Sequence, residues 1–166
     1  MVYIGLILII CIIISMFYYK KKWNPIKKPI FLNNKMITIG HRGTNVEAHE
    51  NTYNAFNKAL ESGLSGVEFD VQITSDNKLI IYHDWTCNKI LSKEKRIEKN
   101  TYTILKNISL NHASFDKIPL LSDILNMLPK KFIKIIEIKS KYIQNTGIEQ
   151  KILTLINKNK ITNYCI

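Results

Sequence analysis

The side chains that could carry out chemistry are concentrated in residues 41–84. Two histidines, an arginine and several carboxylates lie there in the order His41-Arg42-Gly43, Glu50, Glu68, Asp70 and His83-Asp84. Histidines supply general acids and bases near neutral pH, and carboxylates that lie close together need a cation or a proton between them. The fork of an arginine matches the oxygens of a phosphate. The combination indicates metal binding and proton transfer at a phosphate group.

Two of the carboxylates occupy one face of a predicted strand. The apolar segment 67–74 predicts a strand, and because side chains alternate along a strand, Glu68 and Asp70 leave the same face. Val67 and Phe69 leave the opposite face, where helices would cover them. Carboxylate oxygens favour Mg²⁺ or Ca²⁺ over zinc. On these residues alone, an exposed edge strand without a metal stays open as an alternative.

A third carboxylate, Glu137, lies inside the apolar segment 132–138, which predicts another strand. A carboxylate in such a setting needs a partner. Glu137 shares a strand face with Lys139, so the two residues could pair with each other. The same position repeats the pattern of Glu68 and Asp70, which suits a shared cation. The sequence leaves both arrangements open.

Strand and helix signals alternate along the chain. They predict strands at 36–40, 67–74, 79–82, 132–138 and 162–166, and helices at 52–62 (with Asn51 as N-cap), 120–128 and 148–157. The segment 85–117 is weakly periodic and predicts an irregular insertion. Alternating strands and helices imply parallel pairing in an α/β fold. The candidate residues then fall at or near the carboxyl ends of strands, where a β/α barrel builds its site.

The amino end predicts a membrane anchor. Residues 2–19 are almost entirely apolar and would span about 27 Å as a helix, close to the roughly 30 Å of a bilayer core. Lysines follow this run rather than precede it, which favours a retained single-pass anchor over a cleaved signal peptide. We therefore expect a transmembrane anchor at 1–22 and a juxtamembrane linker at 23–35. The lysines predict that the rest of the chain lies on the cytoplasmic side.

The chain is strongly basic, with 24 lysines and arginines, 13 acidic residues and a net charge of +11. It has no basic stripe with interleaved aromatic residues and no zinc-finger spacing, so we expect no nucleic-acid partner. Cys11, Cys87 and Cys165 lack CxxC spacing and predict neither a disulfide framework nor a zinc site. A lysine-rich protein that binds membrane surfaces is an alternative class, but it leaves the ordered polar residues unexplained.

Several motifs follow one another in a fixed order. They are Ile37-Thr38-Ile39-Gly40-His41-Arg42-Gly43, Glu50-Asn51-Thr52, Gly66-Val67-Glu68-Phe69-Asp70-Val71, Asp76, His83-Asp84, Ile118-Pro119-Leu120-Leu121-Ser122-Asp123 and Glu137-Ile138-Lys139. This set resembles the glycerophosphodiester phosphodiesterase family. The resemblance implies a TIM-type barrel over 36–166 that hydrolyses glycerophosphodiesters to glycerol 3-phosphate and an alcohol. Some relatives act on lysophospholipids, and a membrane anchor suits that substrate.

The resemblance also implies a role for each candidate residue. Glu68, Asp70 and Glu137 would ligate a divalent cation, Ca²⁺ or Mg²⁺. His41 and His83 would be the acid–base pair. Arg42 and Lys139 would neutralise phosphate oxygens, and Glu50 would support them. Two turn positions depart from the family pattern, since His49 replaces a usual proline and Asn77 a usual glycine.

The length of the chain limits this interpretation. A barrel of this type needs about 250 residues and eight strands, whereas the 166 residues here carry signals for about five strands. We therefore expect a truncated barrel, incomplete at its carboxyl end. Two further hypotheses follow: an inactive remnant of such an enzyme, or one half of a split enzyme that acts with a complementary carboxyl-terminal fragment.

Overall fold

The structure is a computed structural model, and it describes residues 2–22, 36–44, 46, 48–87, 95–111, 114–140 and 147–166. The chain forms two compact units, Met1–Lys35 and Met36–Ile166. The predicted linker at 23–35 lies outside the described residues.

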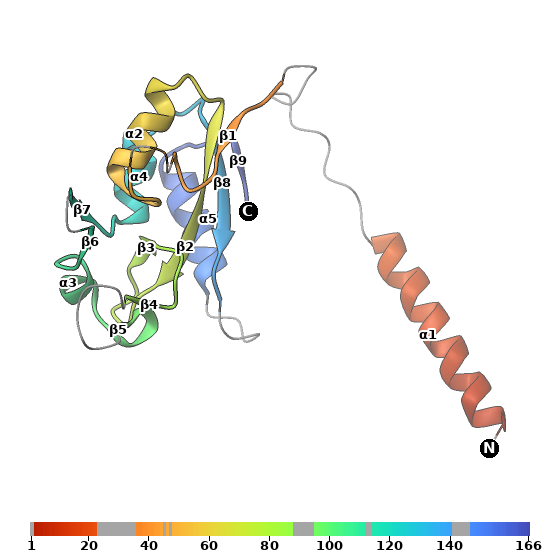
Figure 1. The fold of residues 1–166 in the computed structure, drawn as a ribbon. Coiled ribbons are helices and arrows are strands. Elements are labelled where there is room, and N and C mark those ends of the chain that lie inside the picture. The colour runs from red at the N-terminus through yellow and green to blue at the C-terminus, as the bar shows by residue number, and fades with distance from the viewer. Residues whose placement is uncertain are drawn as a thin grey trace. The chain divides into compact units, whose positions relative to one another are not determined.

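The first unit contains one helix, α1 (Val2–Lys22), within its described part (Figure 1). Its window Tyr3–Lys20 has a mean hydropathy of 2.1 and none of it is buried. By length and composition this helix can cross a membrane. The predicted apolar helix at the amino end is therefore confirmed.

The second unit is built on a parallel sheet. Its parallel strands are β1 (Ile39–Gly40), β2 (Gly66–Ile73), β8 (Ile133–Ile138) and β9 (Tyr164–Cys165), in the order β1-β2-β8-β9. The strand β3 (Leu79–Ile81) pairs with β2 in the antiparallel direction. Five strands were predicted in these places, and all five are present. Because β2 has neighbours on both sides, the edge-strand alternative for Glu68 and Asp70 is wrong.

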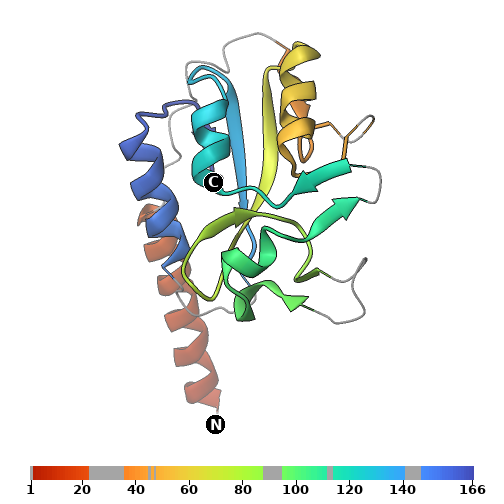
Figure 2. The ribbon, with the colours of Figure 1, turned by 90° about the vertical axis from the view of Figure 1, so that its left-hand side faces the viewer.

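Helices cover one face of this sheet (Figure 2). They are α2 (Tyr53–Glu61), α4 (Leu121–Met127) and α5 (Ile148–Lys158). Val67, Phe69 and Val71 of β2 are fully buried against them, as the alternation of β2 predicts. The core therefore lies between the helices and this face, and Glu68 and Asp70 leave the other face.

The direction of β3 differs from the expected parallel arrangement. Only a short turn joins β2 to β3, whereas a parallel connection needs a crossover of about a dozen residues or more. In the turn, Asn77 has a φ of 61°, a left-handed conformation that asparagine tolerates. The hydroxyl of Thr74 accepts a hydrogen bond from the Lys78 N–H at 3.0 Å. The segment is a hairpin that returns the chain toward the middle of β2.

The predicted irregular insertion at 85–117 is more ordered than expected. Its described part contains β4 (Thr86–Cys87), β5 (Lys95–Arg96), η2 (Ile97–Lys99), α3 (Tyr102–Leu105), β6 (Ser109–Asn111) and β7 (Ser114–Lys117). The insertion also supplies most of a second apolar cluster, formed by Ile80, Cys87, Ile97, Leu105, Ile108 and Ile118. These elements are only two to four residues long, too short for a periodic pattern.

A charged residue lies on the core side of β8. Lys134 is completely buried, and its Nζ donates to the carbonyl oxygens of Pro129 at 2.6 Å, Phe132 at 2.7 Å and Lys130 at 3.4 Å. An ammonium has three donors, so it satisfies the loop that leads into β8. Burial lowers the pKa of Lys134 to about 8. This lysine ties the loop after α4 to the sheet.

We expect the Lys134→Met substitution to lower the free energy of unfolding by about 2 kcal/mol at pH 7, because the charged hydrogen bonds are lost. The unfolded chain holds the lysine proton to a higher pH than the folded chain does, so wild-type stability rises between pH 8 and the ordinary lysine pKa. The gap between wild type and variant should widen over that range. Urea unfolding of the full chain in detergent, followed by tryptophan fluorescence, measures both effects. A gap that does not change with pH would contradict the burial of this ammonium.

Candidate functional site

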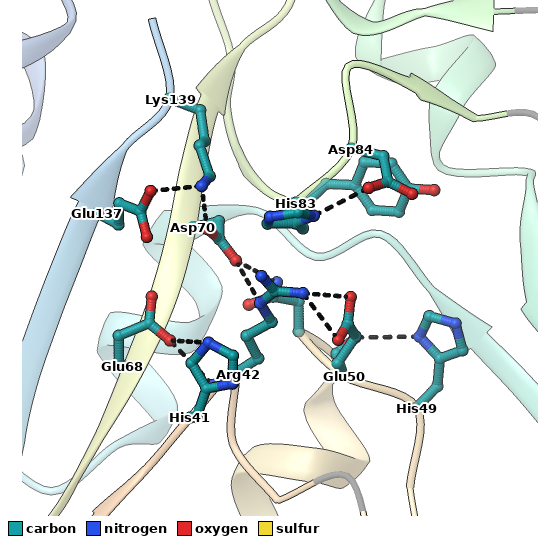
Figure 3. Close-up of polar contacts among 12 residues, drawn as sticks. His41, Arg42, His49, Glu50, Glu68, Asp70, His83, Asp84, Glu137 and Lys139 are labelled. Carbon is teal, nitrogen blue, oxygen red and sulfur yellow. Dashed lines mark hydrogen bonds and ion pairs between the residues drawn. The ribbon is translucent and has the colours of Figure 1, made fainter.

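Three carboxylates meet on the sheet face that the helices leave open (Figure 3). Glu68 and Asp70 come from β2, and Glu137 comes from β8, where it is the register partner of Asp70. Each offers an oxygen, and these oxygens lie within 4.8 Å of one another. The parallel pairing of β2 with β8 therefore creates a cluster that neither strand holds alone.

Asp70 is fully buried at the centre of the site. Arg42 Nε lies 3.2 Å from its Oδ2, and Lys139 Nζ lies 3.2 Å from its Oδ1. The side-chain amide of Asn51 donates a further hydrogen bond to Oδ2 at 2.9 Å. A buried carboxylate is stable only when it has opposite charges and hydrogen bonds nearby. Arg42 and Lys139 supply the charges, and Asn51 supplies a hydrogen bond to Oδ2.

Glu68 is less well satisfied than Asp70. Its Oε2 accepts the backbone N–H of Arg42 at 3.0 Å, but its Oε1 is buried with no hydrogen-bond partner among the described residues. Burial raises the pKa of Glu68, and the negative charges of Asp70 and Glu137 raise it further, although the Arg42 N–H opposes the shift. A cation bound at Oε1 would relieve both the repulsion and the missing hydrogen bond.

The charges of the site fit a divalent cation. Among these contacting residues, the carboxylates outnumber the cationic side chains by two. The carboxylates are Glu50, Glu68, Asp70 and Glu137, and the cationic side chains are Arg42 and Lys139. The oxygen donors are those that Mg²⁺ and Ca²⁺ prefer. Lys139 also contacts Glu137, so the expected Glu137–Lys139 pair is present together with the cluster, and the two arrangements do not exclude each other.

Arg42 is held by carboxylates on two sides. Its Nη1 donates to both oxygens of Glu50 at 3.0 Å, while its Nε faces Asp70. Burial by itself lowers the pKa of Arg42, but the hydrogen bond and charge of Glu50, with the charge of Asp70, raise it above its ordinary value. The guanidinium is therefore fixed and charged beside the carboxylate cluster, where it can face an anion.

The loop after β1 places Arg42 by unusual backbone angles. Arg42 has a φ of 53° and Gly43 a φ of 89°. The Gly43 N–H donates to Gly40 O at 3.3 Å, and the Asn51 N–H donates to Arg42 O at 2.9 Å. A Cβ atom on Gly43 would lie 2.7 Å from the Cβ of Ala55, so helix α2 packs directly on this glycine. The tight turn and close approach explain the glycine of the His41-Arg42-Gly43 motif.

The two histidines reach the site from different strands. His41 follows β1, and its largely exposed ring places Nε2 3.8 Å from Glu68 Oε2. His83 follows β3, and its Nδ1 lies 2.9 Å from Asp84 Oδ1. The antiparallel hairpin brings His83 back to the site, since the Tyr82 N–H donates to Asp70 O at 3.0 Å.

The predicted site residues lie together in Figure 3, with Asp70 and Arg42 between the others. Two further residues at the site were not recognised from the sequence, Asn51 and Gln72. The prediction of Asn51 as N-cap is wrong: Thr52 caps α2 and accepts the Ala55 N–H at 3.2 Å, whereas Asn51 has a φ of 58° and binds Asp70. The alternation that pairs Glu68 with Asp70 extends to Gln72 and could have identified it.

The fold and the site define an α/β barrel-type protein with a cluster of carboxylates that could hold a cation beside a fixed arginine. Residues 41–163 match the model of the glycerophosphoryl diester phosphodiesterase family, and the chain belongs to that family. Its sheet is part of the TIM-type barrel expected from the sequence.

Known relatives agree with this assignment. A glycerophosphodiester phosphodiesterase of Caldanaerobacter subterraneus is 32% identical over 75% of this chain and 54% of its own length. The crystal structure of a glycerophosphodiester phosphodiesterase from Thermotoga maritima is 28% identical with a TM-score of 0.64, covering 78% of this chain and 53% of that one. A phosphodiesterase of Oleispira antarctica, solved with the product sn-glycerol-3-phosphate, is 21% identical with a TM-score of 0.62, covering 78% of this chain and 53% of that one. The chain spans about half the length of the curated relatives it matches.

Two glycines with left-handed backbones allow a matched test of the loop. We expect Gly43→Ala to lower the free energy of unfolding by about 3 kcal/mol, since the new methyl group meets Ala55. Gly63→Ala should cost only about 1 kcal/mol, because Gly63 has a φ of 68° but nothing within 4 Å of the added atom. Urea titrations of the two variants in detergent measure the difference. Equal losses of unfolding free energy would show that the left-handed backbone angle, and not the contact with Ala55, sets the cost of the substitution at Gly43.

Proposed function

We propose that the chain carries the active site of a metal-dependent glycerophosphodiester phosphodiesterase. Hydrolysis would release glycerol 3-phosphate and an alcohol. The observation that carries this proposal is the carboxylate cluster of Glu68, Asp70 and Glu137 beside Arg42 and Lys139, within a chain of this family. The site combines a place for a cation with fixed positive charges for a phosphate.

The cluster of Glu68, Asp70 and Glu137 would hold the cation, Ca²⁺ or Mg²⁺. When bound, such an ion stabilises negative charge that develops on phosphoryl oxygens. The support in this structure is the buried Oε1 of Glu68, which has no hydrogen-bond partner among the described residues, and the set of oxygen donors. Asp70 would keep its contacts with Arg42 and Asn51 on Oδ2, which leaves Oδ1, the oxygen beside Lys139, for the cation.

Arg42 and Lys139 would bind the phosphate side of the substrate, and Glu50 would hold Arg42 in place. Arg42 presents a planar fork whose orientation is fixed by the two oxygens of Glu50 at 3.0 Å. Lys139 bridges Asp70 and Glu137 and adds a second positive charge. Positive groups fixed before the reaction stabilise developing charge without reorganising, which is the main electrostatic source of catalysis.

His41 and His83 would act as general acid and general base. His41 is exposed toward solvent beside Glu68, so it can exchange protons with water. The contact of His83 Nδ1 with Asp84 would hold a proton on that nitrogen and leave Nε2 facing the substrate. One histidine would protonate the departing alkoxide while the other accepts a proton from the attacking group.

The helix α1 would anchor the enzyme in a membrane as a single span, with the catalytic unit at 36–166 on the cytoplasmic side and 23–35 as the connection. The lysines that follow α1 support this orientation. A membrane location would bring lysophospholipids within reach, and they are glycerophosphodiesters with one acyl chain. We therefore propose them as a second substrate group.

We keep a second hypothesis beside this proposal. In it, the site binds its cation but turns over substrate only together with a complementary carboxyl-terminal fragment, or it is an inactive remnant. Cation binding and turnover must therefore be measured separately.

For turnover, we expect the full chain in detergent to release glycerol 3-phosphate from glycerophosphocholine when Ca²⁺ or Mg²⁺ is present. Glu68→Gln and His41→Gln should each lower kcat/KM by about 100-fold or more, since they remove a cation ligand and a proton donor. Glu61→Gln on the exposed part of α2 is the matched control and should retain activity. Unchanged activity in Glu68→Gln would rule out the assigned site.

For cation binding, Ca²⁺ or Mg²⁺ should raise the midpoint of thermal unfolding of the catalytic unit. The gain corresponds to about 2.7 kcal/mol at a concentration of about 100 times Kd, and a chelator should reverse it. Glu68→Gln should lose the effect, whereas Glu61→Gln should keep it. Stabilisation without turnover would favour the split or inactive hypothesis, and the absence of both would reject the metal site.

A further inference from the structure

We propose that Gln72 is a positioning residue that sets the place of His83 relative to the cation site. The catalytic role of Gln72 rests on the proposed function, whereas its hydrogen bonds to the backbone around His83 do not depend on it. Gln72 is 3% exposed, and its side-chain amide nitrogen contacts three consecutive backbone carbonyls around His83.

The place of Gln72 follows from the alternation of β2. Glu68, Asp70 and Gln72 are spaced by two residues, so their side chains leave the same face of the strand. Glu68 and Asp70 supply carboxylates to the cluster, whereas Gln72 supplies a neutral amide one step further along. An amide can donate to carbonyl oxygens that a carboxylate would repel.

The contacts of Gln72 are all on the segment that carries His83. Its Nε2 donates to Tyr82 O at 2.7 Å and to Asp84 O at 2.9 Å, and it lies 3.3 Å from His83 O. The last ladder bond of the hairpin runs from the Tyr82 N–H to Asp70 O, and beyond it the chain bends away from β2. At the bend, the side chain of Gln72 takes the place of the hydrogen bonds between strands. It thereby fixes the backbone on both sides of His83.

This arrangement couples two parts of the candidate site through one strand. Asp70 belongs to the proposed cation site, and Gln72 hydrogen-bonds the bend that carries His83. Only one residue separates them on β2. The ring of His83 is then oriented by Asp84, whose carbonyl is one of the three that Gln72 binds. Gln72 touches no reacting atom in this scheme, so it acts through His83. Displacing a catalytic group by about 1 Å can lower a rate about 100-fold.

The test uses the full chain in detergent and two kinds of measurement. The Gln72→Met substitution keeps the length of the side chain but removes the amide donor. We expect the ¹H–¹³C NMR signal of the His83 ring, assigned with His83→Gln, to shift or broaden in Gln72→Met. The kcat for glycerophosphocholine should fall about 100-fold with KM changed less than about threefold, and the midpoint of Ca²⁺ stabilisation should be unchanged.

Thr74→Val is the matched control. Thr74 directly follows β2, is 4% exposed and binds the turn before β3 rather than the bend at His83. It should lower stability without moving the His83 signal. If Gln72→Met does not fold, Gln72→Asn retains the amide but withdraws it by one methylene, and it should shift the same signal.

An unchanged His83 signal in a folded Gln72 variant overturns the inference, and so does an equal shift in Thr74→Val. If the wild-type chain shows no turnover, the proposed function fails in that form. The NMR comparison still decides the role of Gln72, because it needs no substrate.

Discussion

The buried carboxylate of Asp70 is the constraint on which the rest of the site depends. A charge removed from water is tolerated only with close partners. Asp70 obtains them from the residue after β8, from the loop after β1 and from the residue before the cap of α2. Arg42 and Asn51 come from the connection between β1 and α2, whereas Lys139 directly follows β8. The local strain of the loop and the register of β8 are both explained by their need to meet at this one side chain.

Around this centre, the core and the site use opposite faces of the same strand. Val67, Phe69 and Val71 pack beneath the helices, so β2 cannot rotate or slip by one residue without burying Glu68 in the core. The packing energy of the apolar face therefore holds the polar face in position. The lysine beneath β8, Lys134, adds a second anchor by tying the incoming loop to the sheet.

Much of this arrangement could be predicted from the sequence because it depends on short periods and local signals. Alternation placed Glu68 and Asp70 on one face, and the five strands lie where they were expected. Three of the features that escaped prediction depend on contacts far along the chain or on very short elements. By its residue type and position Asn51 resembles a helix cap, and its role depends on the distant Asp70. The apolar residues of the insertion lie in elements too short to show a pattern. Lys134 has the residue type of a solvent-facing side chain, although it is buried.

The antiparallel hairpin of β2 and β3 also has a consequence for the order in which the site assembles. The contact of Tyr82 with Asp70 closes a short loop, whereas β2 meets β8 only after the whole insertion and α4 have been synthesised. Hairpins form in about 1–10 μs, and contacts between distant segments form more slowly. The half of the site that contains His83 and Asp70 can thus form early as a local unit. Glu137 joins the site only when β8 pairs with β2, and that pairing completes the carboxylate cluster.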